Sequence, residues 1–224
     1  MKLAPRKIRT GQAPLFKRKN RSGQPQILGL TGSIGMGKST AAQMFREEGI
    51  PVFDADLTVH DLYNKTGSEA ALLLAQDKRF RKSVLRHSTG LKVDRSALAD
   101  IITQNPEYKS ALEGIIHPLV AAKRQSFIRQ AAAHKYPLIV LDIPLLYEVG
   151  IDAICDFVLV VTASQAVQKS RLLSRRNLTE ERINFFLKNQ MPDQEKRRMA
   201  DFVINTGHGR NAMRTQVKAL IRSL

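Results

Sequence analysis

The segment GLTGSIGMGKST, residues Gly29–Thr40, decides the fold class of this chain. It contains the spacing G-x-x-x-x-G-K-[ST], which ends at Lys38 and Ser39. An apolar stretch precedes the segment, as expected of a buried strand, and a stretch that favours helix follows it. This order of strand, loop and helix is typical of a loop that binds the phosphates of a nucleoside triphosphate.

The residue types in the loop suit that chemistry. Gly32, Gly35 and Gly37 can adopt positive φ and bring the backbone close to a phosphate chain. Their N–H groups would then form an anion-binding nest at the positive end of the following helix. We expect Lys38 to neutralise the β- and γ-phosphates, and the Ser39 hydroxyl to complete the shell of a Mg²⁺ ion.

The composition is that of a globular protein with a substantial core. The chain has 224 residues, 43% of them hydrophobic and 25% charged, which suits one α/β domain with an insertion. No apolar run approaches the roughly 20 residues that span a bilayer. The single cysteine, Cys155, excludes an internal disulfide and suits a reducing compartment. We therefore expect a cytoplasmic protein in which Cys155 packs in the core.

Half of the net charge of +16 lies at the start of the chain. Residues 1–26 carry eight lysines and arginines and no acidic residue, and their prolines and glycines exclude a long helix. We interpret this segment as a disordered basic leader. Three roles stay open: a leader without a defined partner, weak contact with nucleic acid or an anionic surface, and an organellar transit peptide.

From residue 27 onward, strand-like and helical stretches alternate. Most of the expected strands are continuous apolar runs, as in a parallel sheet that is covered on both faces. The pattern predicts a doubly wound α/β fold with a five-stranded parallel sheet flanked by helices, and a nucleotide-binding core of residues 27–60 and 135–224. The strands are expected at Ile27–Thr31, Pro51–Phe53, Leu138–Asp142, Phe157–Thr162 and Phe202–Asn205.

Residues 61–134 are expected to form a helical insertion that binds the substrate. The interval from Leu57 to His134 contains no convincing strand. Asn105 and Pro106 are typical of an N-cap followed by proline at the first helical position. Amphipathic segments are expected at Ala70–Leu85, Arg95–Thr103, Pro106–Ile116 and Leu119–Ala133.

A second excursion, at about residues 164–192, separates the last two strands. Ser164 and Thr179 are expected to cap helices there. The segment is rich in cations, and because arginine binds phosphoryl oxygens bidentately, we interpret it as a mobile lid over the triphosphate. A solvated basic helix face is the alternative. The cations are Lys169, Arg171, Arg175, Arg176 and Arg182.

Three carboxylates follow expected strands, at the sheet edge where open α/β folds bind ligands. Asp56 is the candidate that accepts or orients the proton of an attacking hydroxyl, whereas Asp54 could cap the next helix. Asp142 ends a strand of the Walker B type, so it could bind Mg²⁺ through water. The sequence lacks the guanine-reading pattern Asn-Lys-x-Asp and the switch pattern Asp-x-x-Gly, which disfavours a GTPase.

Six segments carry a family resemblance by their order and spacing: LTGSIGMGKST (30–40), DAD (54–56), IIHPLV (115–120), DIPLLYE (142–148), QMP (190–192) and ADFVIN (200–205). With these, the chain from residue 27 to its end resembles the dephospho-coenzyme A kinase family. The resemblance implies transfer of the ATP γ-phosphoryl group to the ribose 3′-hydroxyl of dephospho-CoA, giving CoA and ADP in the last step of coenzyme A biosynthesis. It also implies Mg²⁺ and a three-part architecture of core, CoA-binding insertion and lid.

The resemblance also implies roles for individual residues. Asp56 would act on the 3′-hydroxyl, and Asn205 would lie near the adenine ring. The implied catalytic residues are Lys38, Asp56 and Arg175. The implied substrate-binding residues are Asp56, His117, Leu145 and Leu146. Together with the loop, the expected ATP-binding residues are Gly35, Met36, Gly37, Lys38, Ser39, Thr40, Arg171 and Asn205, and the metal-binding residues are Ser39 and Asp142.

Two features depart from the family pattern. Arg176 and Asn177 follow Arg175 where the family often has an acidic residue, and the basic leader precedes the first strand. A nucleoside or nucleoside-monophosphate kinase would explain the loop, Asp56 and the lid, but not the long insertion. A nucleic-acid-associated ATPase is the alternative from another class, motivated by the leader. The sequence leaves the oligomeric state open.

Overall fold

The computed structural model describes residues 23–174, 179, 183, 187 and 190–224. The expected leader therefore lies outside the described residues up to residue 22. Residues 175–178, 180–182, 184–186 and 188–189 of the expected lid also lie outside the described residues, and with them Arg175, Arg176, Asn177 and Arg182.

The chain divides into two compact units. Residues 23–53 and Gln130–Leu224 form the core unit, and Asp54–Arg129 form the insertion unit. The insertion unit begins where the chain leaves the sheet directly into a helix at Ala55, and it ends inside a long helix that continues to Ala133.

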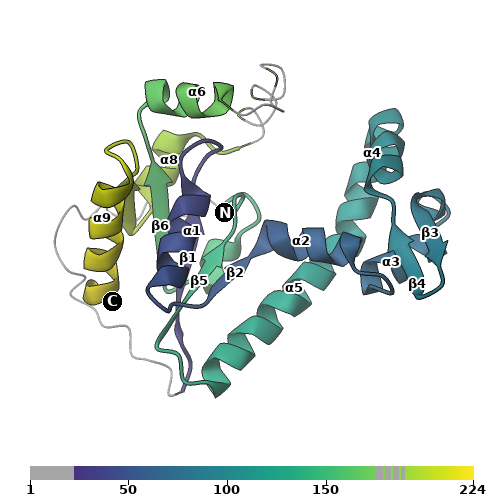
Figure 1. Ribbon diagram of the computed structural model, residues 1–224, viewed down its shortest axis with the longest axis horizontal. Coiled ribbons are helices and arrows are strands. Elements are labelled where there is room, and N and C mark those ends of the chain that lie inside the picture. Colours follow the sequence, from purple (N-terminus) through teal and green to yellow (C-terminus); the bar gives the residue numbers. More distant parts are fainter. Residues whose placement is uncertain (1–22, 175–178, 180–182, 184–186, 188–189) are drawn as a thin grey trace. The chain divides into compact units, whose positions relative to one another are not determined.

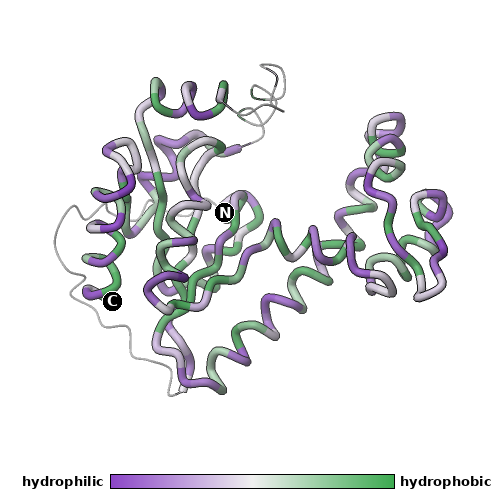
Figure 2. Tube along the Cα trace, in the orientation of Figure 1, coloured by the Kyte–Doolittle hydropathy of each residue, from purple (hydrophilic) through white to green (hydrophobic). Residues whose placement is uncertain are grey.

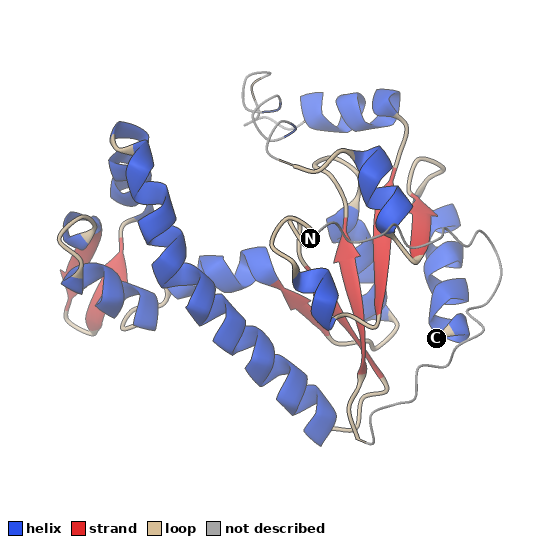
Figure 3. Cartoon of the chain, turned by 180° about the vertical axis from the view of Figure 1, so that it is seen from behind, coloured by secondary structure: helices blue, strands red, loops and turns tan. Residues whose placement is uncertain are grey.

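The core unit contains the predicted five-stranded parallel sheet, in the order β2-β5-β1-β6-β7 (Figures 1 and 3). Each strand was predicted to within a residue of its ends. The central strand β1 pairs with β5 and β6, which follow much later in the chain. The strands are β1 (Gln26–Thr31), β2 (Val52–Asp54), β5 (Leu138–Asp142), β6 (Phe157–Thr162) and β7 (Phe202–Asn205).

One face of the sheet packs on α1 (Lys38–Glu47) and α9 (Arg210–Ser223). Alternate strand residues such as Leu28 and Leu30 point to these helices, because side chains alternate between the faces of a strand. Phe45 of α1 is completely buried among them, and burying such a side chain contributes about 1.5–3 kcal/mol. Figure 2 shows the hydrophobic residues that run along the central strands.

The opposite face of the sheet lies against the chain that follows β5 and against α8 (Asp193–Met199). Gly29 leaves room there, since a Cβ at this position would lie 2.6 Å from Leu146 Cδ1 and 2.8 Å from Cys155 Sγ. Cys155 is buried, as predicted, after the short 3₁₀ helix η3 (Ile151–Ile154).

The helix α6 (Gln165–Leu173) follows β6 in the core unit. Ser164 caps it as predicted, with its hydroxyl accepting a hydrogen bond from Val167 N–H. Thr179, the other predicted cap, accepts a backbone hydrogen bond from Ile183 at its carbonyl oxygen. Within the described part of the chain, no helix combines the length and the apolar character that crossing a bilayer requires.

The insertion unit is mainly helical, and side chains cap three of its helices. Asp54, Ser68 and Asp94 each accept backbone N–H groups of the following first turn, which satisfies donors that a helix leaves unpaired. The elements are α2 (Ala55–Asn64), α3 (Glu69–Gln76), η1 (Arg81–Ser83), β3 (Val84–His87), β4 (Gly90–Val93), α4 (Arg95–Gln104), η2 (Pro106–Tyr108) and α5 (Lys109–Ala133).

The expectation that this interval contains no strand is wrong. β3 and β4 form an antiparallel hairpin in which Val84 pairs with Val93 and His87 pairs with Gly90. The helix expected over Ala70–Leu85 ends at Gln76. Most of the hairpin's residues are at least partly exposed, so its strands lack the apolar runs that reveal the buried strands of the core.

The two helices expected on either side of Pro118 form the single helix α5. A proline inside a helix removes one backbone hydrogen bond and costs about 3 kcal/mol. Apolar contacts around the buried Ile116, which include Leu112 and Leu119, offset this cost. Pro106 lies at the first position of η2, as predicted, but the Asn105 amide donates to Ile101 O instead of capping that turn.

Candidate active site

The phosphate loop, residues 32–37, connects β1 to α1 in the core unit. Gly35 and Gly37 have φ values of 80° and 88°, in the left-handed region that favours glycine. Gly37 is the N-cap of α1, and no side chain of the described residues caps this helix. The N–H groups of its first turn therefore remain donors for an anion, at the positive end of the helix dipole.

Gly32 serves the loop in a different way from the one expected. Its φ is not positive. A Cβ at Gly32 would lie 2.7 Å from the carbonyl oxygen of Val161 and 2.6 Å from its Cγ2. The loop thus begins where the backbone packs directly on β6, and glycine is required for space.

A pair of alanine substitutions separates close packing from backbone freedom. Gly32→Ala should lower the free energy of unfolding by about 1–3 kcal/mol, because the added methyl group meets a backbone oxygen that cannot move aside. Gly114→Ala, in α5, should raise it by about 0.5–1 kcal/mol, since no atom lies within 4 Å of the new Cβ. Urea titration of both variants measures the two effects. A Gly32→Ala protein as stable as the parent would contradict the packing argument.

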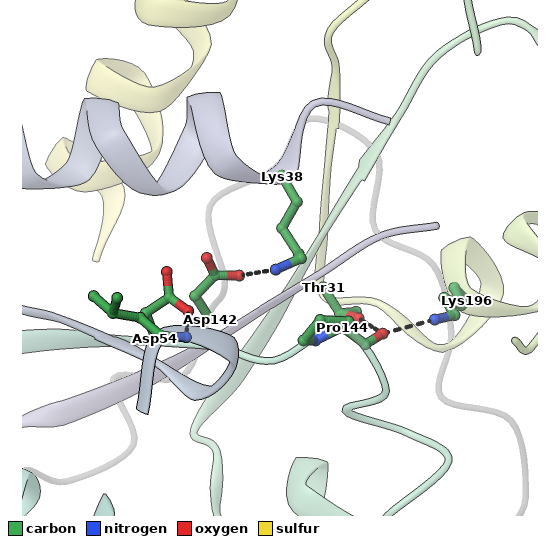
Figure 4. A network of polar contacts seen from close by, with 7 residues as sticks. Thr31, Lys38, Asp54, Asp142, Pro144 and Lys196 are labelled. Atoms are coloured by element: carbon green, nitrogen blue, oxygen red, sulfur yellow. Dashed lines mark hydrogen bonds and ion pairs between the residues drawn. The ribbon is translucent and has the colours of Figure 1, made fainter. Parts of the chain in front are cut away.

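Lys38, the first residue of α1, forms an ion pair with the last residue of β5. Its Nζ lies 2.6 Å from Asp142 Oδ1 (Figure 4). The Asp142 side chain is only 2% exposed, and that of Lys38 is 15% exposed. Because β5 and β1 are neighbours in a parallel sheet, their carboxyl ends bring this cation and carboxylate together beside the phosphate loop.

The first turn of α1, directly after the loop, provides oxygen ligands for a magnesium ion. Ser39 is exposed and Thr40 is half-buried. No group of three or more His, Cys, Asp or Glu side chains within the described ranges could hold a metal by itself. Mg²⁺ in phosphoryl-transfer sites keeps several waters and binds to one or two protein oxygens together with substrate phosphates. The Ser39 hydroxyl and the Asp142 carboxylate fit this mode of binding.

Arg171 and Thr206 fasten the phosphate loop to α6 and to the end of β7. The Arg171 guanidinium donates to Thr206 Oγ1 at 2.8 Å, to Thr206 O at 2.7 Å and to Gly35 O at 3.3 Å. Thr206 is 2% exposed, and its hydroxyl donates in turn to Met36 O at 2.9 Å. Arg171, expected to bind ATP, thus contacts the backbone of the loop that carries the candidate phosphate-binding N–H groups.

Thr206→Val should loosen this fastening while it keeps a branched side chain of similar shape. We expect the KM for ATP to rise by about tenfold, since the lost Met36 and Arg171 contacts are each worth about 1–3 kcal/mol when a buried partner loses its bond. Steady-state kinetics with varied ATP measure the change. Thr206→Ser keeps the hydroxyl and is the matched control; equal KM values for the two variants would mean that the hydroxyl does not order the loop.

Asn205, expected near the adenine ring, ends β7 and precedes this network. Its side-chain oxygen accepts a hydrogen bond from Gly207 N–H at 2.8 Å, and its backbone exchanges hydrogen bonds with the Gln216 side chain. Asn205 also lines a cavity of about 720 Å³ that extends to Ser33 and Met36 of the β1–α1 connection. Asn205 is therefore an ordered residue beside the phosphate loop.

Residues 143–148 follow β5 directly and are in turn conformation from residue 144 onward; we call this segment the turn after β5. Its start is held by the hydrogen bond from Ile143 N–H to Leu30 O at 3.0 Å. Leu145 is 38% exposed, whereas Leu146 is completely buried against Gly29. Of the two leucines expected to bind substrate, Leu145 lies at the surface and Leu146 packs under the turn.

Comparison with known proteins identifies the family. The model of the dephospho-CoA kinase family matches residues 26–211. The chain belongs to the dephospho-CoA kinase family. A dephospho-CoA kinase of Rhodopseudomonas palustris (strain ATCC BAA-98 / CGA009) is 43% identical over 197 residues, 88% of this chain and 94% of that protein. The corresponding enzyme of Mesorhizobium japonicum is 46% identical over 198 residues, 88% of this chain and 96% of that protein.

Solved structures agree with this assignment. The dephospho-CoA kinase of Campylobacter jejuni has a TM-score of 0.65 at 26% identity and covers 88% of this chain and 95% of its own. A crystal structure of a Thermus thermophilus protein has a TM-score of 0.72 at 30% identity, and the alignment covers 90% of this chain and 98% of that one. The fold of this chain is therefore similar to that of a solved dephospho-CoA kinase.

All but one of the remaining predicted site residues of this dephospho-CoA kinase family member lie in the insertion unit. Asp54 caps α2 by accepting a hydrogen bond from Leu57 N–H at 2.9 Å, the role considered for it as an alternative to catalysis. Asp56 lies in the first turn of α2 and is exposed. His117 is an exposed residue in the middle of α5, directly before Pro118. Arg175 lies outside the described residues.

The structure also shows residues to which sequence analysis gave no role. Gln190 Oε1 accepts a hydrogen bond from Ile34 N–H of the phosphate loop at 3.1 Å. Glu148 Oε1 accepts one from Met191 N–H at 2.7 Å and forms an ion pair with Lys196 at 3.0 Å. The segments PLLYE and QMP, which carried the family resemblance, are therefore joined in space. In the sequence, the only sign of these contacts was that both segments belong to the set that carries the family resemblance.

Proposed function

We propose that this chain phosphorylates the ribose 3′-hydroxyl of dephospho-CoA with ATP, giving CoA and ADP, the last step of coenzyme A biosynthesis. The observation that carries the proposal is the phosphate loop at an uncapped helix N-terminus, with the Lys38–Asp142 pair beside it, in a member of the dephospho-CoA kinase family. The family supports a phosphotransferase with ATP as donor, and it does not favour the nucleic-acid-associated ATPase.

The ATP end of the reaction rests on the core unit. The N–H groups of Gly35 and of residues 37–40 would bind the phosphate oxygens, and Lys38 would leave Asp142 to neutralise the β- and γ-phosphates. Ser39 and Asp142 would hold Mg²⁺, which supplies charge neutralisation on the phosphates when bound. Asn205 would contact the adenosine part, from its place along the cavity next to the loop.

At the acceptor end, we carry over the roles that the family resemblance implies for Asp56 and His117 in the insertion unit and, separately, for the turn after β5 in the core unit. The 3′-oxygen forms a bond to the γ-phosphorus while the bond from that phosphorus to the β,γ-bridging oxygen breaks, and ADP leaves. Asp56 would orient the hydroxyl in line and accept its proton. His117, Leu145 and the underlying Leu146 would position the acceptor nucleotide. Arg175 would bind the charge that develops on the transferring group.

ADP release distinguishes the candidate acceptors directly. The full-length protein is incubated with Mg·ATP and one of dephospho-CoA, AMP, a nucleoside or RNA, and ADP is measured with a coupled assay. We expect rapid release with dephospho-CoA only, together with CoA that carries a new 3′-phosphate. Turnover with AMP or a nucleoside but not with dephospho-CoA would overturn the proposal in favour of the other kinase class.

A further inference from the structure

A completely buried lysine lies beneath the turn that follows β5. Lys196 of α8 has a relative exposure of 0%. Its Nζ donates to the carbonyl oxygen of Pro144 at 3.1 Å (Figure 4). The same Nζ lies 3.0 Å from Glu148 Oε1. Lysine is almost never fully buried unless it is paired, because its charged group loses its hydration. Both oxygens that the ammonium group contacts belong to the turn after β5. Lys196 therefore holds this turn in place.

The Pro144 carbonyl is held from two sides. Thr31 Oγ1, at the end of β1, donates to the same oxygen at 2.9 Å. Thr31 is itself completely buried. The chain that leaves Asp142 is therefore fixed between the central strand and α8 immediately before it reaches Leu145. The hydrogen bonds from Thr31 and Lys196 to Pro144 O do not involve the phosphate loop. Their effect is therefore on the turn itself.

Glu148 closes the same arrangement at the other end of the turn. Its Oε1 receives both the Lys196 ammonium and the Met191 N–H. Gln190, one residue earlier, accepts from Ile34 of the phosphate loop. Residues 190–196 thus contact the loop at one point and the turn at three, and Lys196 makes two of the contacts with the turn.

We infer that Lys196 is a positioning residue for the acceptor nucleotide: it sets the place of the Pro144–Leu146 turn and so the fit of dephospho-CoA, without touching substrate. The inference rests on the proposed function, in which this turn binds the acceptor. An apolar side chain of similar length could fill the same space. What the lysine adds is the fixed position of two oxygens, Pro144 O and Glu148 Oε1. A shift of about 1 Å in a positioning element can cost about 10²-fold in rate.

Lys196→Met tests this role, because methionine fills the space without the two contacts. Glu148 keeps its Met191 N–H and its side chain is 20% exposed, so the variant does not strand a buried carboxylate. We expect kcat/KM for dephospho-CoA to fall by about 10²-fold, while KM for ATP stays within about threefold. Arg198→Met, an exposed cation of the same helix, is the matched control and should behave like the parent.

Thr31→Val and Glu148→Gln report on the same turn if Lys196→Met fails to fold. Each should reduce kcat/KM for dephospho-CoA more than it raises KM for ATP. A purely structural lysine would instead lower Tm and leave KM for both substrates unchanged in the folded fraction, which would overturn the inference. Failure of the proposed function is separate, since the parent protein would then bind ATP but release no ADP with dephospho-CoA.

Discussion

Replacing Lys38 with alanine should lower kcat with dephospho-CoA by about 10²-fold or more, because a preorganised charge at the transferring phosphoryl group contributes on this scale. The variant should also be less stable. Asp142 is 2% exposed and loses the Lys38 ammonium at 2.6 Å, one of its partners; removing one partner of a buried ion pair costs up to about 3–5 kcal/mol. Coupled-assay kinetics and thermal unfolding, measured on the same preparation, check the two parts.

Two further variants separate activity from stability. Lys38→Ala combined with Asp142→Asn also removes the buried negative charge that Lys38 balances, so Tm should recover in part while kcat stays low. Lys218→Ala removes a lysine whose ion pair with Glu48 lies on the surface of α9, and both quantities should match the parent. Near-normal turnover in folded Lys38→Ala protein would show that the phosphate loop is not the site of transfer.

Asp56→Asn should lower kcat by about 10²–10⁴-fold, the usual range for the loss of a general base or an orienting carboxylate. ATP binding should change little. The helix should survive, since Asp56 is exposed in the first turn of α2 and its charge contributes only about 0.3–1 kcal/mol there. Turnover and ATP affinity are measured separately, by steady-state kinetics and by equilibrium titration.

Asp61→Asn, an exposed aspartate of the same helix, is the matched control and should keep the parental kcat. If Asp56→Asn kept its kcat but bound ATP much more weakly, Asp56 would serve the metal ion and not the acceptor hydroxyl. A weaker binding of dephospho-CoA with unchanged kcat would instead indicate a contact made equally in the ground state and the transition state.

The elements that could be predicted from the sequence are those with a local signal. Apolar runs located most of the five strands of the core sheet, and the loop spacing located the helix that begins at Lys38. The hairpin from Val84 to Val93 was not predicted, because its strands are short and partly exposed. The continuity of the helix through Pro118 was not predicted, because this helix is stabilised by packing against residues elsewhere in the insertion unit.

The contacts that order the candidate site could not be predicted in the same way. Thr206 donates to Met36, a residue 170 positions away, and a lone threonine after a strand carries no sign of that partner. Lys196 stands in the polar run Asp193–Arg198, which reads as a surface helix, although its own side chain is completely buried. Such pairs follow from topology, which the pattern of a single chain specifies only coarsely.

The place of β1 in the sheet has a consequence for how the protein is made. Ile27 N–H binds the side chain of Asp156, 129 residues later, and both strands beside β1 are encoded after residue 137. During synthesis both edges of β1 therefore remain unpaired until more than half of the chain has left the ribosome. The insertion unit has been synthesised completely by then. Long-range parallel pairing is slow to form and exposed to aggregation in the meantime. We therefore expect the sheet around the phosphate loop to form after the insertion unit.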